Sequence, residues 1–127
     1  MSKLEIKQTY KFPKVVFDPF NNFYEISGHS IPENAYDFYA PIFDWIDKNI
    51  QTIEAPVLEF NFKLDYMNSS STRMLIMLLG KLEQVANEKR QILIKWFYED
   101  NEDDYDVGKL YQSTTSLPFR MIPIFKN

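Results

Sequence analysis

The sequence has no cysteine and a single histidine, His29, among its 127 residues. Without cysteine the chain has no disulfides, thiolate nucleophiles, cysteine-ligated zinc sites or iron–sulfur clusters. One imidazole also falls short of the two that most zinc sites use, and a catalytic triad could take its imidazole only from His29. These absences argue against most familiar hydrolytic chemistry.

Glycine is almost as scarce, with only Gly28, Gly80 and Gly108. The P-loop pattern Gly-x-x-x-x-Gly-Lys is absent, which excludes nucleotide binding by that route. No run of about 18 uncharged apolar residues occurs, so we expect no membrane insertion. Residues 1–12 alternate charged and apolar side chains without the apolar core of a secretion signal, and we therefore expect a cytoplasmic protein.

Positive charge is not concentrated anywhere, although the net charge of −4 has a local origin. Six of the 18 acidic residues lie in the segment 99–106 without a base, which leaves 12 acids against 14 bases elsewhere. Because no basic stripe can neutralise the phosphates of a duplex, we expect no nucleic-acid partner. The segment lacks the spaced ligands and the central glycine of an EF-hand, so we expect a solvated acidic loop rather than a metal site.

Hydrophobic residues nevertheless make up 45% of the chain and aromatic residues 17%, enough for an ordinary core. This length and composition predict one folded domain over residues 1–127. Two β-prone segments, 15–17 and 23–26, flank a turn and predict an N-terminal hairpin. The next helix is expected to be capped by Ser30 and to be kinked, or divided into two short consecutive helices, at Pro41. Its core face takes apolar residues at steps of three and four (Tyr36, Tyr39, Phe43, Ile46 and Ile50).

The second half of the chain alternates strands and helices. The segment 57–64 predicts a strand, with Leu58, Phe60, Phe62 and Leu64 on its core face. The helix that follows contains Gly80, at a point where we expect close backbone packing. Further strands at 91–97 and 119–125 enclose a short helix at 105–112. The order predicts an α/β fold with a mixed sheet of about five or six strands, an N-terminal hairpin and about three to four helices.

Four consecutive hydroxyl residues, 69–72, stand where the strand at 57–64 leads into the following helix. The carboxyl ends of such strands form the usual functional edge of the sheet, so we expect function there. A helix N-terminus accommodates the charge of a phosphorylated Ser or Thr. Because Ser and Thr commonly cap helices, the residues alone favour a cap and a polar loop over a phosphorylation site.

Two other observations leave alternatives open. Asp65 and Asp104 could converge at the same edge as an acid–base pair, which would make the chain a Mg²⁺-dependent enzyme. Trp96 and Tyr98 are most simply core or half-buried aromatics, but they lie on the same face of one strand and could border a partner surface.

Four short motifs carry a resemblance to a known family, in family order and over nearly the whole chain: residues 23–28 (FYEISG) with Ser30, Pro32, Glu33 and Asn34; Phe38, Tyr39 and Pro41 with Asp44 and Trp45; Leu64 and Tyr66 with residues 68–73 (NSSSTR); and Trp96 and Tyr98 followed by acids. With these motifs the chain resembles the SiaC family of bacterial regulatory phosphoproteins. Each motif is weak alone, and the four in register make the resemblance specific.

The resemblance implies a small α/β domain similar to STAS domains and anti-sigma-factor antagonists, without enzymatic activity and without a cofactor. Family members are phosphorylated by a SiaB-type protein kinase and dephosphorylated by a SiaA-type PP2C phosphatase. In the unmodified form they bind and stimulate a SiaD-type diguanylate cyclase, which raises cyclic di-GMP and controls biofilm formation. The chain is thus expected to be a cytoplasmic component of a partner-switching module.

The family's phosphoacceptor, the Thr of an Asn-Thr-Ser-Ser motif, falls on Ser69 here, with Ser70 and Ser71 as alternatives. The surroundings of the site are then Asn68, Thr72 and Arg73. The expected partner-binding residues are Tyr66, Trp96, Tyr98, Asp103 and Asp104. A structural interaction domain whose hydroxyl run only caps a helix remains the alternative to this switch.

Overall fold

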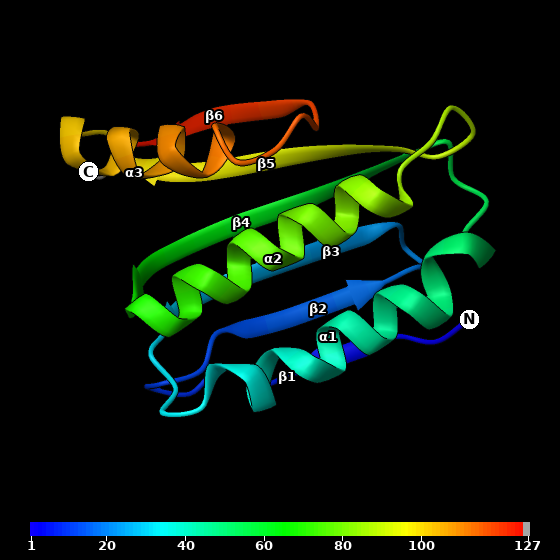
Figure 1. Cartoon of the computed structure of the whole chain (residues 1–127), viewed down its shortest axis with the longest axis horizontal. Helices are drawn as coiled ribbons and strands as arrows, with labels where there is room; N and C mark the ends of the chain where they lie inside the picture. The colour runs from blue at the N-terminus through cyan, green and yellow to red at the C-terminus, as the bar shows by residue number, and fades with distance from the viewer. Residues whose placement is uncertain (126–127) are drawn as a thin grey trace.

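The computed structural model describes residues 1–125, in which a six-stranded sheet carries three α-helices (Figure 1). This architecture confirms the predicted α/β class, the mixed sheet and the N-terminal hairpin. In chain order the elements are β1 (Leu4–Ile6), β2 (Lys14–Asp18), β3 (Phe23–Ser30), α1 (Ala35–Asn49), the 3-10 turn η1 (Ile50–Thr52), β4 (Val57–Met67), α2 (Ser69–Val85), β5 (Gln91–Glu99), α3 (Glu102–Gln112) and β6 (Phe119–Ile124).

The strands lie in the sheet in the same order as in the chain. The pairs β1–β2 and β2–β3 are antiparallel, whereas β3, β4, β5 and β6 are parallel neighbours joined through α1, α2 and α3. Successive right-handed crossovers in one direction place all three helices on the same face of the sheet (Figure 1). Within residues 1–125, no helix is both long enough and apolar enough to cross a membrane.

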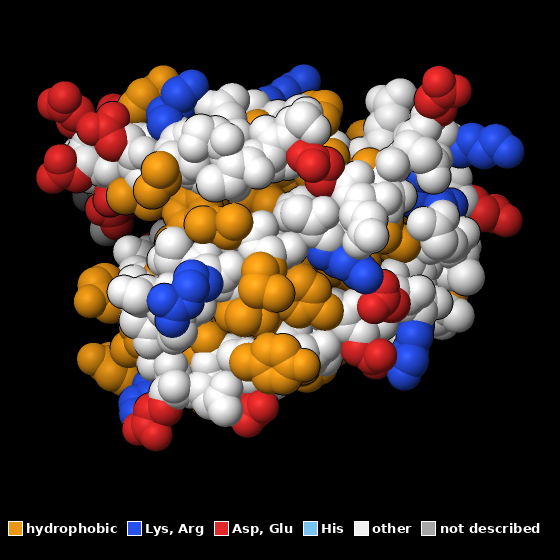
Figure 2. Space-filling model, viewed as in Figure 1, with side chains coloured by type: hydrophobic (Ala, Val, Ile, Leu, Met, Phe, Trp, Pro, Cys, Tyr) orange, Lys and Arg blue, Asp and Glu red, His pale blue; other side chains and the backbone are white. Residues whose placement is uncertain are grey.

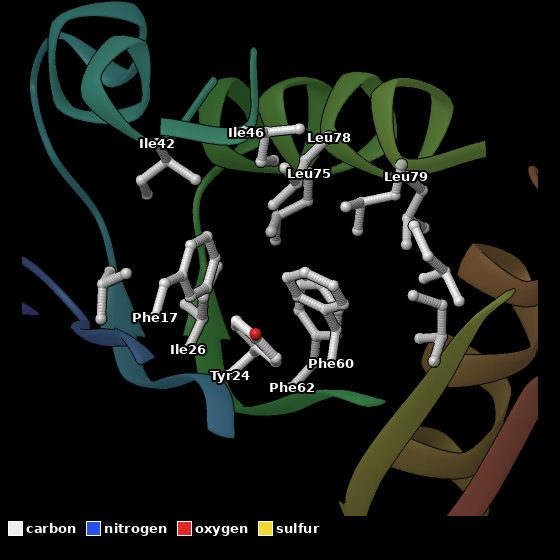
Figure 3. Packing of buried hydrophobic residues seen from close by; sticks show 14 of the residues in the cluster. Phe17, Tyr24, Ile26, Ile42, Ile46, Phe60, Phe62, Leu75, Leu78 and Leu79 are labelled. Atoms are coloured by element: carbon white, nitrogen blue, oxygen red, sulfur yellow. The ribbon is translucent and has the colours of Figure 1, made fainter. Parts of the chain in front are cut away.

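The core lies between the sheet and its helices. In Figure 3, aromatic side chains of the sheet such as Phe17, Tyr24 and Phe60 point toward Ile46 of α1 and Leu75 of α2. Burial of each such side chain contributes about 1.5–3 kcal/mol to stability. The alternation predicted for β4 is confirmed, because Leu58, Phe60 and Phe62 are all buried, while Leu64 near the end of the strand is half-buried.

The face of the sheet opposite the helices carries charged side chains in ion pairs. Glu25 of β3 is buried between Lys14 and Lys63, with its carboxylate oxygens 3.6 and 2.8 Å from the two ammonium nitrogens. On the next two strands, Lys95 pairs with Glu59 at 3.1 Å. A buried charge of this kind needs compensating partners, which Lys14 and Lys63 supply on this face.

Helix α1 differs from the sequence prediction at its start and in its middle. Its N-cap is Asn34, whose side chain accepts a hydrogen bond from the Asp37 amide, so the predicted cap at Ser30 is wrong. The predicted core position Tyr36 is exposed. A single helix also continues through Pro41, so the alternative of two short consecutive helices is wrong. The Pro41 ring is exposed to solvent, where water can bond the carbonyl group that lacks an amide partner.

Gly80 does not mark a close approach of the backbone. A Cβ atom added there would meet no atom of the described residues within 4 Å, so the expectation of tight packing is wrong. Gly108 of α3 is the opposite case, because a Cβ at this position would lie 2.8 Å from Cδ1 of Trp96 and would also collide with Met121. The third helix can approach β5 only with glycine at this position.

These two glycines give a matched pair of substitutions. We expect Gly80→Ala to raise the free energy of unfolding by about 0.5–1 kcal/mol, because alanine favours the helix and the added methyl group meets open space. Gly108→Ala should lower it, since Trp96 and Met121 must move. Urea unfolding followed by tryptophan fluorescence measures both; a destabilising Gly80→Ala would contradict the open surroundings of Gly80.

Candidate functional site

The first turn of α2 is fixed by Asn68, its N-cap. The Asn68 side chain accepts a hydrogen bond from the Ser71 amide at 3.0 Å and donates one to the Pro32 carbonyl at 3.1 Å. The Asn68 backbone amide donates to the Ser30 carbonyl, also at 3.1 Å. The hydroxyl side chains therefore do not cap the helix as the sequence favoured, because an amide side chain does so and also anchors the turn to the end of β3.

This fixed turn sorts the candidate phosphoacceptors by exposure. Ser69 is exposed to solvent, and Ser70 is half-buried and donates to the Asn68 side-chain oxygen at 3.1 Å. Ser71 is completely buried. Arg73, one turn after Ser69, is exposed like it. A protein kinase acting on the folded chain would thus reach the hydroxyl of Ser69 more readily than that of Ser71.

The Ser71 hydroxyl belongs to a buried network of three hydroxyl groups. Ser30 donates to Ser71 at 2.8 Å, and Ser30 and Tyr39 share a hydrogen bond of 2.6 Å. Burial raises the pKa of Tyr39 to about 12, so its phenol stays protonated at neutral pH. The network ties β3, α1 and α2 together in the same helical turn that carries the exposed Ser69.

Near their C-terminal ends, the neighbouring strands β4 and β5 separate. The ladder between β4 and β5 ends at the pair Phe62 and Trp96. Beyond it, four of the last five residues of β4 pair with β3, and Asp65 is passed over at an irregularity in that register. The last three residues of β5 pair with β6. The two strands diverge at this end of the sheet, as Figure 1 shows.

A groove of about 460 Å³ occupies this opening and is closed on one side by α3. It is lined by residues of β4 (Lys63, Leu64, Asp65, Tyr66 and Met67), α2 (Thr72), β5 (Trp96, Phe97, Tyr98 and Glu99), α3 (Asp104, Val107, Leu110 and Tyr111) and β6 (Ile124). Four of the five predicted partner-binding residues line it together, and the fifth, Asp103, lies in the first turn of α3. Two of the lining residues, Met67 and Thr72, lie within three positions of Ser69 in the sequence.

Stacked aromatic rings form the floor of the groove. Trp96 lies between Tyr111 of α3 and Phe62 of β4, with ring centroids 4.6 and 5.8 Å away and nearly parallel planes. The Tyr111 hydroxyl donates a hydrogen bond to Thr72 at 3.1 Å, and burial raises the pKa of this phenol. The fourth residue of α2 is therefore linked directly to the wall of the groove.

The sequence did not reveal the contribution of α3. Its expected range, 105–112, left the preceding acids in a loop, whereas the helix begins at Glu102 behind the N-cap Asn101. Acidic residues in a first turn are favoured by the helix dipole. Leu110 is 60% exposed although it lines the groove. An exposed leucine on a short helix gives no signal in a sequence, because its neighbours come from distant strands.

Negative charge predominates around the groove. Its lining includes three carboxylates, Asp65, Glu99 and Asp104, against one ammonium group, Lys63. Asp65 and Asp104 therefore share one groove, as the sequence allowed. Figure 2 shows acidic side chains gathered at the end of the molecule where α3 begins, next to apolar surface. Among residues 1–125, no three acidic or histidine side chains are arranged so as to hold a metal ion.

Comparison with known proteins identifies the family. The sequence model of the SiaC family regulatory phosphoproteins matches residues 6–124. The chain belongs to the SiaC family. This confirms the resemblance seen in the sequence and the expected signalling role.

Individual proteins and solved structures also match nearly the whole chain. The chain is 28% identical over 120 residues, and 94% of each chain, to an uncharacterized protein of Pseudomonas aeruginosa strain UCBPP-PA14. The structure of SiaC of Pseudomonas aeruginosa matches 98% of this chain and 100% of that one, at 25% identity and a TM-score of 0.86. A further match is a chain in the structure of the diguanylate cyclase SiaD in complex with its activator SiaC, also from Pseudomonas aeruginosa. That match covers 95% of this chain and 99% of the other, at 25% identity and a TM-score of 0.86.

The link between α2 and α3 can be tested by a double-mutant cycle. Tyr111→Phe removes the hydroxyl and keeps the stacked ring, and Thr72→Val removes the acceptor; we expect each to cost about 1 kcal/mol of unfolding free energy. Because both changes break the same hydrogen bond, the double variant should be more stable than the sum of the single effects predicts by about 0.5–1.5 kcal/mol. Strict additivity in urea unfolding would show that the two hydroxyls do not interact.

Proposed function

We propose that this chain is a non-enzymatic adaptor of a bacterial signalling module, which binds and regulates a partner protein and is switched by phosphorylation of Ser69. The observation that carries the proposal is the position of an exposed Ser69 at the N-terminus of α2, next to a groove with exposed apolar walls. Membership of a family of regulatory phosphoproteins supports it. The whole chain, residues 1–127, would act as one cytoplasmic SiaC-like regulatory domain.

The proposed partner is a SiaD-type diguanylate cyclase. A protein similar to this chain over nearly its whole length is described as the activator of such a cyclase and occurs in a complex with it. The chain offers a surface suited to a protein partner, because Tyr66 and Leu110 at the groove are 62% and 60% exposed. Aromatic and aliphatic groups of this kind are typical of binding interfaces.

Phosphorylation by a SiaB-type kinase, reversed by a SiaA-type PP2C phosphatase, is the proposed control. Of the three candidate serines, Ser69 has the most accessible hydroxyl, Ser70 is already bonded to Asn68, and Ser71 is buried. A phosphate on Ser69 would carry a charge of about −1.5 to −2 and would be favoured by the positive end of α2. Arg73 lies one turn further on and is placed to form a charge-assisted hydrogen bond with it.

A phosphate at this position would weaken docking without unfolding the chain. Any apolar partner surface that covers Ser69 would have to strip water from the phosphate, and this desolvation is costly. A loss of about 1.4 kcal/mol already lowers affinity tenfold. The buried network behind Ser69 holds the turn in place, so we expect the modified and unmodified chains to share one fold.

The acceptor can be identified by mass. We expect incubation with a SiaB-type kinase and Mg-ATP to add one phosphate to the peptide that contains residues 68–73, and Ser69→Ala to abolish it. Ser71→Ala is the matched control, because a buried hydroxyl should not be modified and its loss should leave the phosphate in place. Phosphate that persists in Ser69→Ala would move the acceptor to Ser70 or Ser71.

The output can be measured with the cyclase. We expect the fully phosphorylated chain to bind a SiaD-type cyclase at least tenfold more weakly than the unmodified chain, and to stimulate cyclic di-GMP synthesis correspondingly less. The Ser69→Ala chain should bind and stimulate the cyclase as the native chain does, and incubation with the kinase should not change this. If the phosphorylated chain binds as well as the unmodified chain, the alternative of an interaction domain without a switch replaces this proposal.

A further inference from the structure

We propose that the groove between β4, β5 and α3 receives a segment of the protein partner. An arginine or lysine side chain of this segment, the anchor, inserts among the acidic and aromatic residues of the lining, and apolar residues flank it in the segment. The inference rests on the proposed adaptor function and adds the chemistry of the partner. It follows from three properties of the groove: its charge, its rings and its rim.

The negative charge of the groove favours a cationic ligand. The Asp65 side chain is exposed and has no hydrogen bond or ion pair with any other residue in the described part of the chain. Lys63, the cation of the lining, is already paired with Glu25 at 2.8 Å and lies over the Phe97 ring, 4.8 Å from its centroid. The carboxylate of Asp65 is therefore left for a positive group from outside the chain.

The rings of the groove favour the same kind of side chain. Tyr66 and Tyr98 line it together with the carboxylates, and Tyr66 is mostly exposed. A guanidinium or ammonium group is attracted to the face of an aromatic ring, and its aliphatic stem packs well against such surfaces. An anionic or purely apolar ligand would gain nothing from Asp65 and Asp104 and would suffer from their desolvation.

The rim of the groove shows that the anchor belongs to a protein segment. Exposed apolar side chains surround the opening, among them Leu110, Val107 and Ile124, at 60%, 44% and 39% exposure. A free amino acid or an isolated cation would leave these groups in water. A chain segment with apolar residues beside its basic residue would cover them and gain their burial.

Because the anchor is positively charged, the groove carboxylates and a phosphate on Ser69 should affect partner affinity by different mechanisms. A phosphate on Ser69 adds negative charge, which by itself would attract a basic partner. Phosphorylation must therefore act through desolvation at close contact, which salt screens poorly, whereas the attraction of Asp65 and Asp104 for the anchor is screened. The effect of the phosphate on affinity should persist in high salt, and the effect of the groove carboxylates should fade.

The test compares two double variants of equal charge. Asp65→Asn with Asp104→Asn neutralises the groove, and Glu54→Gln with Glu88→Gln removes the same charge from exposed sites near the opposite ends of β4 and β5. We expect the groove variant to bind a SiaD-type cyclase at least tenfold more weakly at 0.1 M salt and to lose affinity less steeply as salt rises. The control variant should stay within twofold of the native chain. Equal affinities for the two variants would overturn the proposal and leave the adaptor function standing.

A second arm does not depend on the cyclase. A library of random 12-residue peptides is selected on the unmodified native chain, and the enriched peptides are measured against both double variants. We expect enriched sequences with Arg or Lys among apolar residues, whose affinity falls at least tenfold for the groove variant alone. Enrichment without a basic residue, or no peptide that distinguishes the groove variant, would overturn the inference even if the cyclase proved not to be the partner.

Discussion

The N-cap of α2 determines which side chains this chain presents. Asn68 holds the first turn by hydrogen bonds to the Ser71 amide and to the carbonyl groups of Pro32 and Ser30. A rotation of the helix by two residues, about 200°, would carry Ser69 to the buried position of Ser71 and Ser71 to the exposed position of Arg73, because neighbouring positions lie about 100° apart around the axis. The identity of the accessible hydroxyl is therefore a consequence of one amide side chain and its tertiary partners.

Local pattern was sufficient to predict most of the fold but only part of the site. Strict alternation identified β4, and the order of strands and helices identified the α/β class. Ser30 was misassigned as a cap because its role depends on Tyr39 and Ser71, which no local pattern reveals. The divergence of β4 and β5 likewise arises between strands about 30 residues apart, so the sequence placed aromatic and acidic residues at an edge without showing that they enclose a groove.

Because all three helices lie on one face of the sheet, its C-terminal edge is the part that we propose to contact a partner. One face is covered by the core, and the other is occupied by ion pairs such as that of Glu25 with Lys63. The C-terminal edge is where backbone pairing stops and side chains from β4, β5 and α3 can meet. At 25% identity and a TM-score of 0.86, SiaC of Pseudomonas aeruginosa retains this architecture, which alternation and core volume specify more than individual residues do.

A rigid turn that carries the proposed modification site has a consequence for competition inside the cell. If docking covers Ser69, the bound and phosphorylated states exclude each other, and thermodynamic linkage makes the exclusion reciprocal. A partner present in excess shields the hydroxyl from the kinase, and a scarce partner leaves most of the chain open to modification. Under the proposed switch, the abundance of the partner would then feed back on its own regulator, and the module would respond to the ratio of its components as well as to the activity of its enzymes.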